Sequence, residues 1–232
     1  MRIDRLVGLL TICSFLLPAQ NSARGASVAV EYSARLKMSS RSELDRRLHA
    51  AFTEGTAHPA GVSNCAELLA QRGHAPQPQA PDREIQAERS TMAECLVLHE
   101  LRRAKPARSS YLRDLPWDER VLPLLPPQLA ITVSAESERA ASDAASHGRN
   151  WPDFDPSAAA SAKGPEEIVV TGNGFREQLI LWGRGDFDGD GTDDLLVQSL
   201  DTFTEGTYRN TRLFVLTRRT ANGRLSLVRS LL

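Results

Sequence analysis

The sequence predicts an α+β fold in which a disulfide-linked helical N-terminal region precedes a small antiparallel β-sheet. Three observations predict it: helical spacing of apolar residues up to about residue 134, short β-rich runs after residue 166, and two cysteines within the helical half. Of the 232 residues, 41% are hydrophobic and 25% are charged, which excludes collagen-like, coiled-coil and polytopic membrane proteins. The formal net charge of −1 gives no support for nucleic-acid binding.

Residues 1–25 have the pattern of a signal peptide. Two arginines precede an apolar run at residues 6–17, and small residues follow it. The run is shorter than the roughly 20 apolar residues of a membrane-spanning helix. We therefore expect a secreted or periplasmic protein that is not an integral membrane protein after signal cleavage. The alternatives are a buried N-terminal helix and lipid attachment at Cys13, and the bulky Ile12 disfavours the second.

Residues 26–134 are predicted to form a mainly helical domain. Asn64 and Glu67 match a capping box at the start of a short helix. A long helix is expected to begin after Asp82, an N-cap residue, and to end before Pro106, which cannot continue it.

Cys65 and Cys95 are predicted to form a disulfide between the short helix and the long one. Two cysteines in an exported chain most simply pair with each other. Closing a loop of this length stabilises the fold by roughly 3–4 kcal/mol in the chain-entropy model. Two free thiols are the alternative, which an oxidising compartment disfavours.

Residues 135–165 are predicted to be an Ala/Ser-rich linker. Nine alanines and five serines fall in this stretch, and no apolar period is visible. The island Trp151–Pro156 either docks on a neighbouring surface or belongs to an exposed, flexible segment.

Residues 166–232 are predicted to form a small β domain, because short β-branched and aromatic runs alternate with turn signals. Asn222-Gly223 favours a two-residue hairpin turn. In that register Phe214 pairs with Leu231.

The stretch Asp186–Asp194 carries the most specific chemical signal. Acidic residues occupy positions 1, 3, 5 and 9, and a glycine at position 6 allows a sharp turn. Calcium takes about six to eight oxygen ligands, which carboxylates, a backbone carbonyl and water supply. The predicted metal ligands are Asp186, Asp188, Asp190, Asp194 and the carbonyl of Thr192. An empty, solvated turn is the poorer alternative, because five carboxylates within nine residues repel one another.

The run Gly185–Val197 (GDFDGDGTDDLLV) resembles the calcium loop of FG-GAP and VCBS-type repeats. In that family a strand enters the loop, an acidic nonapeptide wraps calcium and an apolar strand leaves it. The resemblance covers about residues 178–231 and implies one calcium-binding β unit. The family usually builds propellers of several blades, whereas this chain has one copy, so neither the propeller nor its ligand-binding face is carried over. The N-terminal half resembles no family. An EF-hand is excluded, because Val197 stands where that loop needs glutamate.

Candidate catalytic groups are few. His99-Glu100 lies on the long predicted helix but lacks the second histidine of a zinc motif. Asp118 and Glu119 are adjacent and therefore point in different directions on a helix. We predict no catalytic residue.

The predicted function follows from these features. We expect an exported, non-enzymatic calcium-binding protein whose calcium is structural and whose partner is an envelope or extracellular protein or polysaccharide, with no nucleic acid. Six arginines and no acid lie between Tyr208 and Leu232, either to meet an anionic partner or to balance acids within the fold. The competing functions are a secreted hydrolase with a structural calcium site and a structural envelope component.

Overall fold

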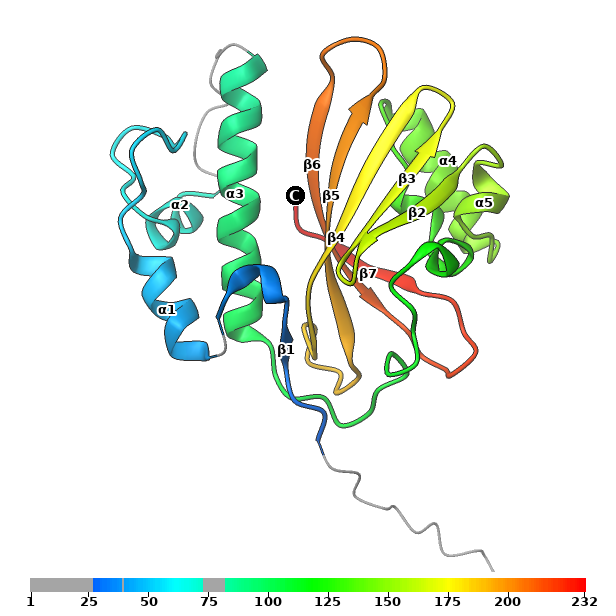
Figure 1. Cartoon of the computed structure of the whole chain (residues 1–232), viewed down its shortest axis with the longest axis horizontal. Coiled ribbons are helices and arrows are strands. Elements are labelled where there is room, and N and C mark those ends of the chain that lie inside the picture. The colour runs from blue at the N-terminus through cyan, green and yellow to red at the C-terminus, as the bar shows by residue number, and fades with distance from the viewer. Residues whose placement is uncertain (1–26, 39, 73–81) are drawn as a thin grey trace, which may run out of the picture.

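A central antiparallel sheet separates two helical layers (Figure 1). The computed structural model describes residues 27–38, 40–72 and 82–232, so the predicted signal peptide lies outside the described residues. The mixed α+β fold is confirmed. In the described ranges, no helix combines the length and the apolar character needed to cross a membrane.

The first helical layer contains α1, α2 and α3. Their bounds are α1 Arg41–His49, α2 Cys65–Ala70 and α3 Asp82–Arg103, and a 3-10 turn η1 (Ala34–Leu36) precedes them. As expected, the Asn64 side chain accepts the Glu67 N–H at the start of α2. The disulfide between Cys65 and Cys95 joins the start of α2 to the middle of α3, with the Cα atoms 5.1 Å apart.

The sheet is a meander in the order β2-β3-β4-β5-β6-β7. The strands are β1 (Glu31–Tyr32), β2 (Ala159–Gly164), β3 (Glu167–Gly172), β4 (Phe175–Gly185), β5 (Asp194–Phe203), β6 (Arg209–Thr217) and β7 (Ser226–Ser230). Strand β3 pairs with β4 as far as Ile180, and β1 then takes its place beside Gly183. A side chain at Gly183 would put a Cβ 2.7 Å from the Glu31 carbonyl oxygen, so the approach of β1 requires glycine.

Each face of the sheet has its own apolar core, because side chains along a strand alternate between the faces. Leu196 of β5 and Val215 of β6 pack with Leu101 of α3 on the first face. Leu195 and Val197 pack on the opposite face, with the segment that follows α3. Both cores therefore combine residues from 26–134 with residues from 166–232.

The second layer includes the stretch predicted to be a linker, and here the structure differs from the expectation. Its elements are η2 (Glu119–Leu124), η3 (Pro127–Leu129), α4 (Ala135–Ser146) and α5 (Trp151–Phe154). Ser134 and Ser137 form a capping box for α4, and Ala141 and Ala144 are buried. Trp151 is 0% exposed and donates its backbone N–H to Leu125 O at 3.0 Å. Small alanines pack closely and favour helix, so the missing apolar period did not signify a linker.

The predicted β6–β7 hairpin is also wrong in its register. Phe214 pairs with Ser230, and eight residues (218–225) separate the two strands. The cause is a tertiary contact: Leu225 is buried in the core that contains Leu195 and Val197, and it donates its N–H to Leu124 O at 2.9 Å. The Arg218 Nε donates to Gly223 O at 2.8 Å, which closes the longer loop.

Candidate metal centre

The acidic loop joins β4 to β5 and is held by the segment that follows α3. Lys105 and Asp186 exchange two backbone hydrogen bonds, of 3.0 and 2.9 Å. Further along, the Asp193 N–H donates to Ser109 O at 2.9 Å. The segment at residues 105–110 therefore runs beside the loop and fixes it to the end of the helical layer.

Three of the predicted ligands lie together. Asp186, Asp188 and Asp194 each place a carboxylate oxygen in one group whose members all lie within 4.8 Å of one another. Asp194 is 0% exposed and Asp186 is 6% exposed, whereas Asp188 is exposed at the surface. The protein therefore encloses this group of carboxylates at Asp194, whereas solvent reaches it at Asp188.

The backbone of the loop curls around its own acids. The two oxygens of Asp186 accept the N–H groups of Gly189 at 2.6 Å and Gly191 at 3.1 Å. Asp188 Oδ1 accepts the Asp190 N–H at 2.9 Å. Gly189 and Gly191 have φ values of 89° and 86°, which explains the glycines at these two positions.

Asp194 is the residue that most needs a cation. Its Oδ2 accepts the Phe187 N–H at 3.1 Å, while its Oδ1 is buried and, among the residues that the structure describes, has no hydrogen-bond donor at bonding geometry. The pKa of Asp194 is raised to about 7, chiefly by burial and in part by the charges of Asp188 and Asp190, although the Thr217 hydroxyl and the Phe187 N–H lower it. Ionising a buried carboxylate with an unsatisfied oxygen is unfavourable unless a positive charge pairs with it. The residues of the loop thus fit an oxygen-ligated cation.

The other two predicted ligands are the carboxylate of Asp190 and the carbonyl of Thr192. The carboxylate of Asp190 is outside the three-residue group; it accepts the Thr192 N–H at 2.6 Å and pairs with Arg219 at 3.2 Å. The Thr192 N–H lowers the pKa of Asp190, which keeps this acid ionised. The Thr192 carbonyl stays a predicted ligand.

Asp193, the remaining acid of the loop, has a role that the sequence did not indicate. It is 2% exposed, and its Oδ2 accepts the Ser110 hydroxyl at 2.8 Å. Burial raises its pKa. Asp193 therefore ties the loop to the 105–110 segment from the inside.

The structure contains a second polar cluster that the sequence analysis did not predict. Arg212 of β6 contacts Asp201 through Nε–Oδ2 at 2.5 Å and Glu177 through Nη2–Oε2 at 3.2 Å. Glu177 and Asp201 are directly opposite each other on β4 and β5, and both are almost wholly buried. Burial raises the pKa of Glu177 well above its usual range. The one sequence feature that could have indicated this cluster is the presence of single charged residues inside apolar strands.

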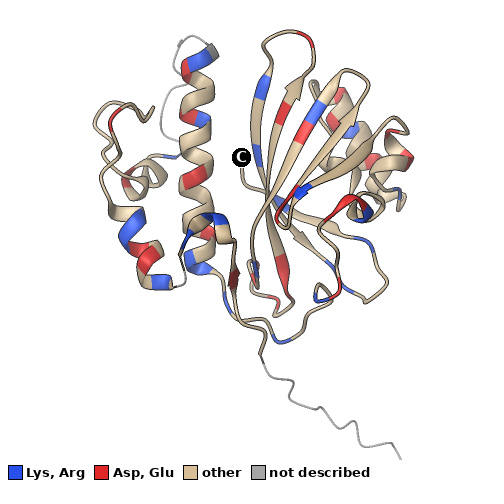
Figure 2. Ribbon diagram, viewed as in Figure 1, with Lys and Arg blue, Asp and Glu red and all other residues tan. Residues whose placement is uncertain are grey.

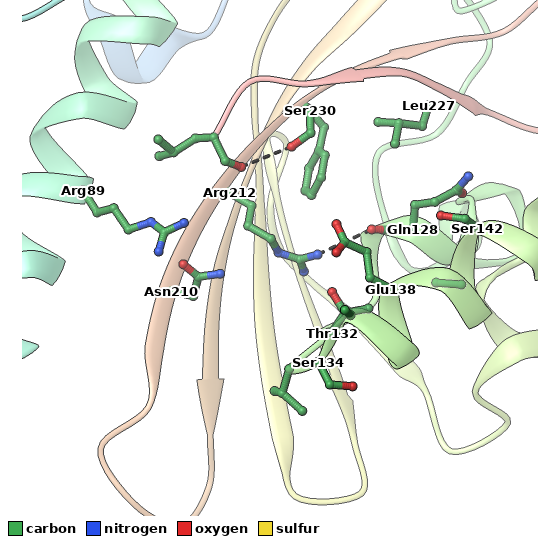
Figure 3. A pocket seen from close by; sticks show the side chains of 15 residues that line it. Arg89, Gln128, Thr132, Ser134, Glu138, Ser142, Asn210, Arg212, Leu227 and Ser230 are labelled. Atoms are coloured by element: carbon green, nitrogen blue, oxygen red, sulfur yellow. Dashed lines mark hydrogen bonds between the residues drawn. The ribbon is translucent and has the colours of Figure 1, made fainter. Parts of the chain in front are cut away.

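This Arg212 cluster also fastens the second layer to the sheet. Arg212 donates to Leu129 O at 2.6 Å and to Ala130 O at 3.1 Å, and Glu177 accepts the Ile131 N–H at 2.6 Å. Arg212 of this cluster lines a cavity of about 530 Å³, together with residues of α4 and β7. Figure 3 shows Arg212 and Glu138 of α4 among the side chains that line this cavity.

The C-terminal arginines are largely balanced within the fold, where acidic and basic residues are interspersed (Figure 2). Besides Arg212, three of them form ion pairs with acids. These pairs are Arg219–Asp190 at 3.2 Å, Arg224–Asp153 at 3.7 Å and Arg229–Glu100 at 2.6 Å. Internal charge compensation is thus the better supported of the two alternatives.

The weak catalytic candidates have local partners. His99 Nε2 lies 3.4 Å from Arg103 Nη1, and burial lowers the pKa of His99. Asp118 caps η2 by accepting the Arg120 N–H at 2.9 Å. These contacts give no facing acid/base pair. In comparisons with known proteins, no family model, curated protein or solved structure matches the chain.

Proposed function

We propose that the protein is an exported calcium-binding protein whose ion, held by the Asp186–Asp194 loop, stabilises a surface that binds an envelope or extracellular partner. The observation that carries this proposal is the environment of Asp194. A fully buried carboxylate with an unsatisfied oxygen faces two further carboxylates, and a divalent cation satisfies all three.

Calcium fits this donor set better than the other common ions. All side-chain donors in the group are carboxylate oxygens, whereas zinc prefers nitrogen and sulfur ligands. Magnesium demands near-ideal octahedral geometry and retains several waters, whereas calcium accepts irregular oxygen sites. The resemblance of Gly185–Val197 to FG-GAP and VCBS-type loops supports the same choice.

The ion has a structural role in this proposal. The loop is bonded through its backbone to Lys105 and Ser109, and residues 105–110 connect α3 to the second layer. Fixing the loop therefore fixes the junction of the two helical layers with the sheet. Extracellular calcium sites of this kind bind at about 10⁻⁴–10⁻³ M, which matches the calcium available outside the cell rather than within it.

Calcium is expected to raise the melting temperature of the purified protein. At ten times the dissociation constant, ligand linkage adds about 1.4 kcal/mol of stability. For a chain of this size that corresponds to roughly 3–6 °C. Calorimetry with millimolar calcium, with magnesium and with a chelator measures the shift, which we expect to be larger for calcium than for magnesium.

Asp188→Asn is the matching loop variant. It keeps the acceptor for the Asp190 N–H but removes one ligand charge. Its melting temperature should respond little to calcium. The exposed Asp114, which lies outside the loop, gives the control Asp114→Asn with a normal response. Equal melting curves in calcium and chelator for the unaltered protein would refute the assignment.

Calcium affinity is expected to fall as the pH drops below about 7. With no cation bound, Asp194 has a pKa of about 7, raised by burial, so below that pH ion binding must displace its proton. The apparent affinity should then fall by up to about tenfold per pH unit and level off above the pKa. Calorimetric titration between pH 5.5 and 8.5 tests this, and an affinity independent of pH would contradict it.

A further inference from the structure

A cavity opens directly beside the metal loop. It has a volume of about 420 Å³, and Asp186 and Asp188 form one wall. The end of α3 and the strand β7 form the other walls, through Arg103, Lys105 and Arg229. We call this space the loop cavity.

A calcium ion held by the three grouped carboxylates would need more oxygen ligands than the loop supplies. Calcium takes about six to eight oxygens, whereas the three grouped carboxylates give three when each binds through one oxygen, and the predicted Thr192 carbonyl adds a fourth. Asp194 is fully buried and closes the inner side, whereas Asp188 is exposed and lines the cavity. Because Asp186 and Asp188 both line the cavity, water or a ligand oxygen can reach a bound ion from this side.

Two cations of the loop cavity have no acidic partner among the described residues. Arg229 is neutralised by Glu100, with 2.6 Å between Nη2 and Oε2. In the part of the chain that the structure describes, no carboxylate lies within ion-pair distance of Arg103 or Lys105. The Arg103 side chain lies 3.4 Å from the ring nitrogen Nε2 of His99, whose pKa burial lowers.

Cation binding reverses the charge balance of this region. When all three carboxylates of the metal group are ionised, they exceed Arg103 and Lys105 by one negative charge. A divalent ion turns that excess into one positive charge. The low dielectric beside the buried Asp194 strengthens this change, because charges near a protein interior are screened less than in water.

We propose that the calcium-loaded loop cavity binds an oxyanion group, a carboxylate or phosphate carried by a larger ligand such as an acidic saccharide. One oxygen of the group completes the coordination of the ion, while Arg103 and Lys105 contact the others. This inference rests on the proposed calcium site and names the chemistry of its partner. Linkage is reciprocal, so calcium and the anion each tighten the binding of the other by the same factor.

The test uses three sugars that share one ring: glucuronate, glucose 1-phosphate and glucose. Each is titrated calorimetrically into the purified protein with calcium and with chelator. Binding of one or both charged sugars with calcium only, and no binding of glucose, is the expected result. The two charged sugars distinguish a carboxylate from a phosphate ligand.

Two variants test whether Arg103 and Lys105 bind the charged sugar. Arg103→Gln and Lys105→Gln should each weaken binding of the charged sugar about tenfold, the effect of losing one charge-assisted hydrogen bond. Neither should weaken calcium binding, because each removes a positive charge near the ion. The exposed Arg113 lies outside the lining of the loop cavity, so Arg113→Gln is the control and should bind like the unaltered protein.

The outcomes separate this inference from the proposed function. Calcium binding without any binding of the charged sugars overturns the inference and leaves the calcium site standing. Equal binding of the charged sugars in chelator, or equal binding of glucose, also overturns it. Failure of calcium itself to bind, measured before any sugar is added, refutes both.

Discussion

Replacing Arg212 with methionine is expected to lower the free energy of unfolding by about 3–5 kcal/mol. The substitution leaves Glu177 and Asp201, which are 0% and 1% exposed, facing each other without a positive charge. It also removes the donors to Leu129 O and Ala130 O that hold the second layer on the sheet. Urea denaturation followed by circular dichroism measures the loss.

An exposed arginine provides the matched control. Arg224 pairs with Asp153 at 3.7 Å, with about half of each side chain exposed, so Arg224→Met should cost less than about 1 kcal/mol. Combining Arg212→Met with Glu177→Gln should recover part of the loss, because one buried charge is removed. A cost below about 1 kcal/mol for Arg212→Met alone would show that the cluster is not a stabilising element.

Removing the disulfide is expected to cost about 3–4 kcal/mol through the entropy of the unfolded chain. Cys65 and Cys95 are 30 residues apart, and both are buried between α2 and α3. The double variant Cys65→Ala, Cys95→Ala should therefore unfold at lower urea concentration.

The unaltered protein in a strong reductant should lose stability by a similar amount, whereas the reductant should not affect the double variant. Each single variant, with either Cys65 or Cys95 replaced by alanine, opens the loop and also leaves one free thiol. Comparing them with the double variant separates the effect of the open loop from that of the thiol. A double variant as stable as the unaltered protein in oxidising buffer would contradict the chain-entropy account.

Local patterns in the sequence predicted the elements that depend on local interactions. The cap at Asn64, the disulfide and the turns of the acidic loop all depend on residues close in sequence or on the chemistry of one residue type. Local patterns did not predict the features that depend on contacts between distant segments. Leu225 lies in a long loop because it packs in a core with residues from the second layer, and no local turn signal contains that information.

In the candidate site, too, local features were predicted and long-range contacts were not. The pattern at Asp186, Asp188 and Asp194 was sufficient to predict that these acids converge. It could not indicate that Asp190 pairs with Arg219, since that arginine comes from the loop after β6. The Arg212 cluster was invisible for a similar reason, because the register that places Glu177 opposite Asp201 is a property of the folded sheet.

The short strand β1 has a consequence for the order of assembly. The meander from β2 to β7 joins strands that follow one another in sequence, whereas β1 and β4 are about 150 residues apart. Closing a loop five times longer than that of the disulfide costs about 1.4 kcal/mol more in chain entropy. The N-terminal layer is thus the part of the molecule whose docking is entropically most demanding. The covalent cross-link lies within that layer and the acidic loop lies against its end, so both shorten the conformational search that the docking requires.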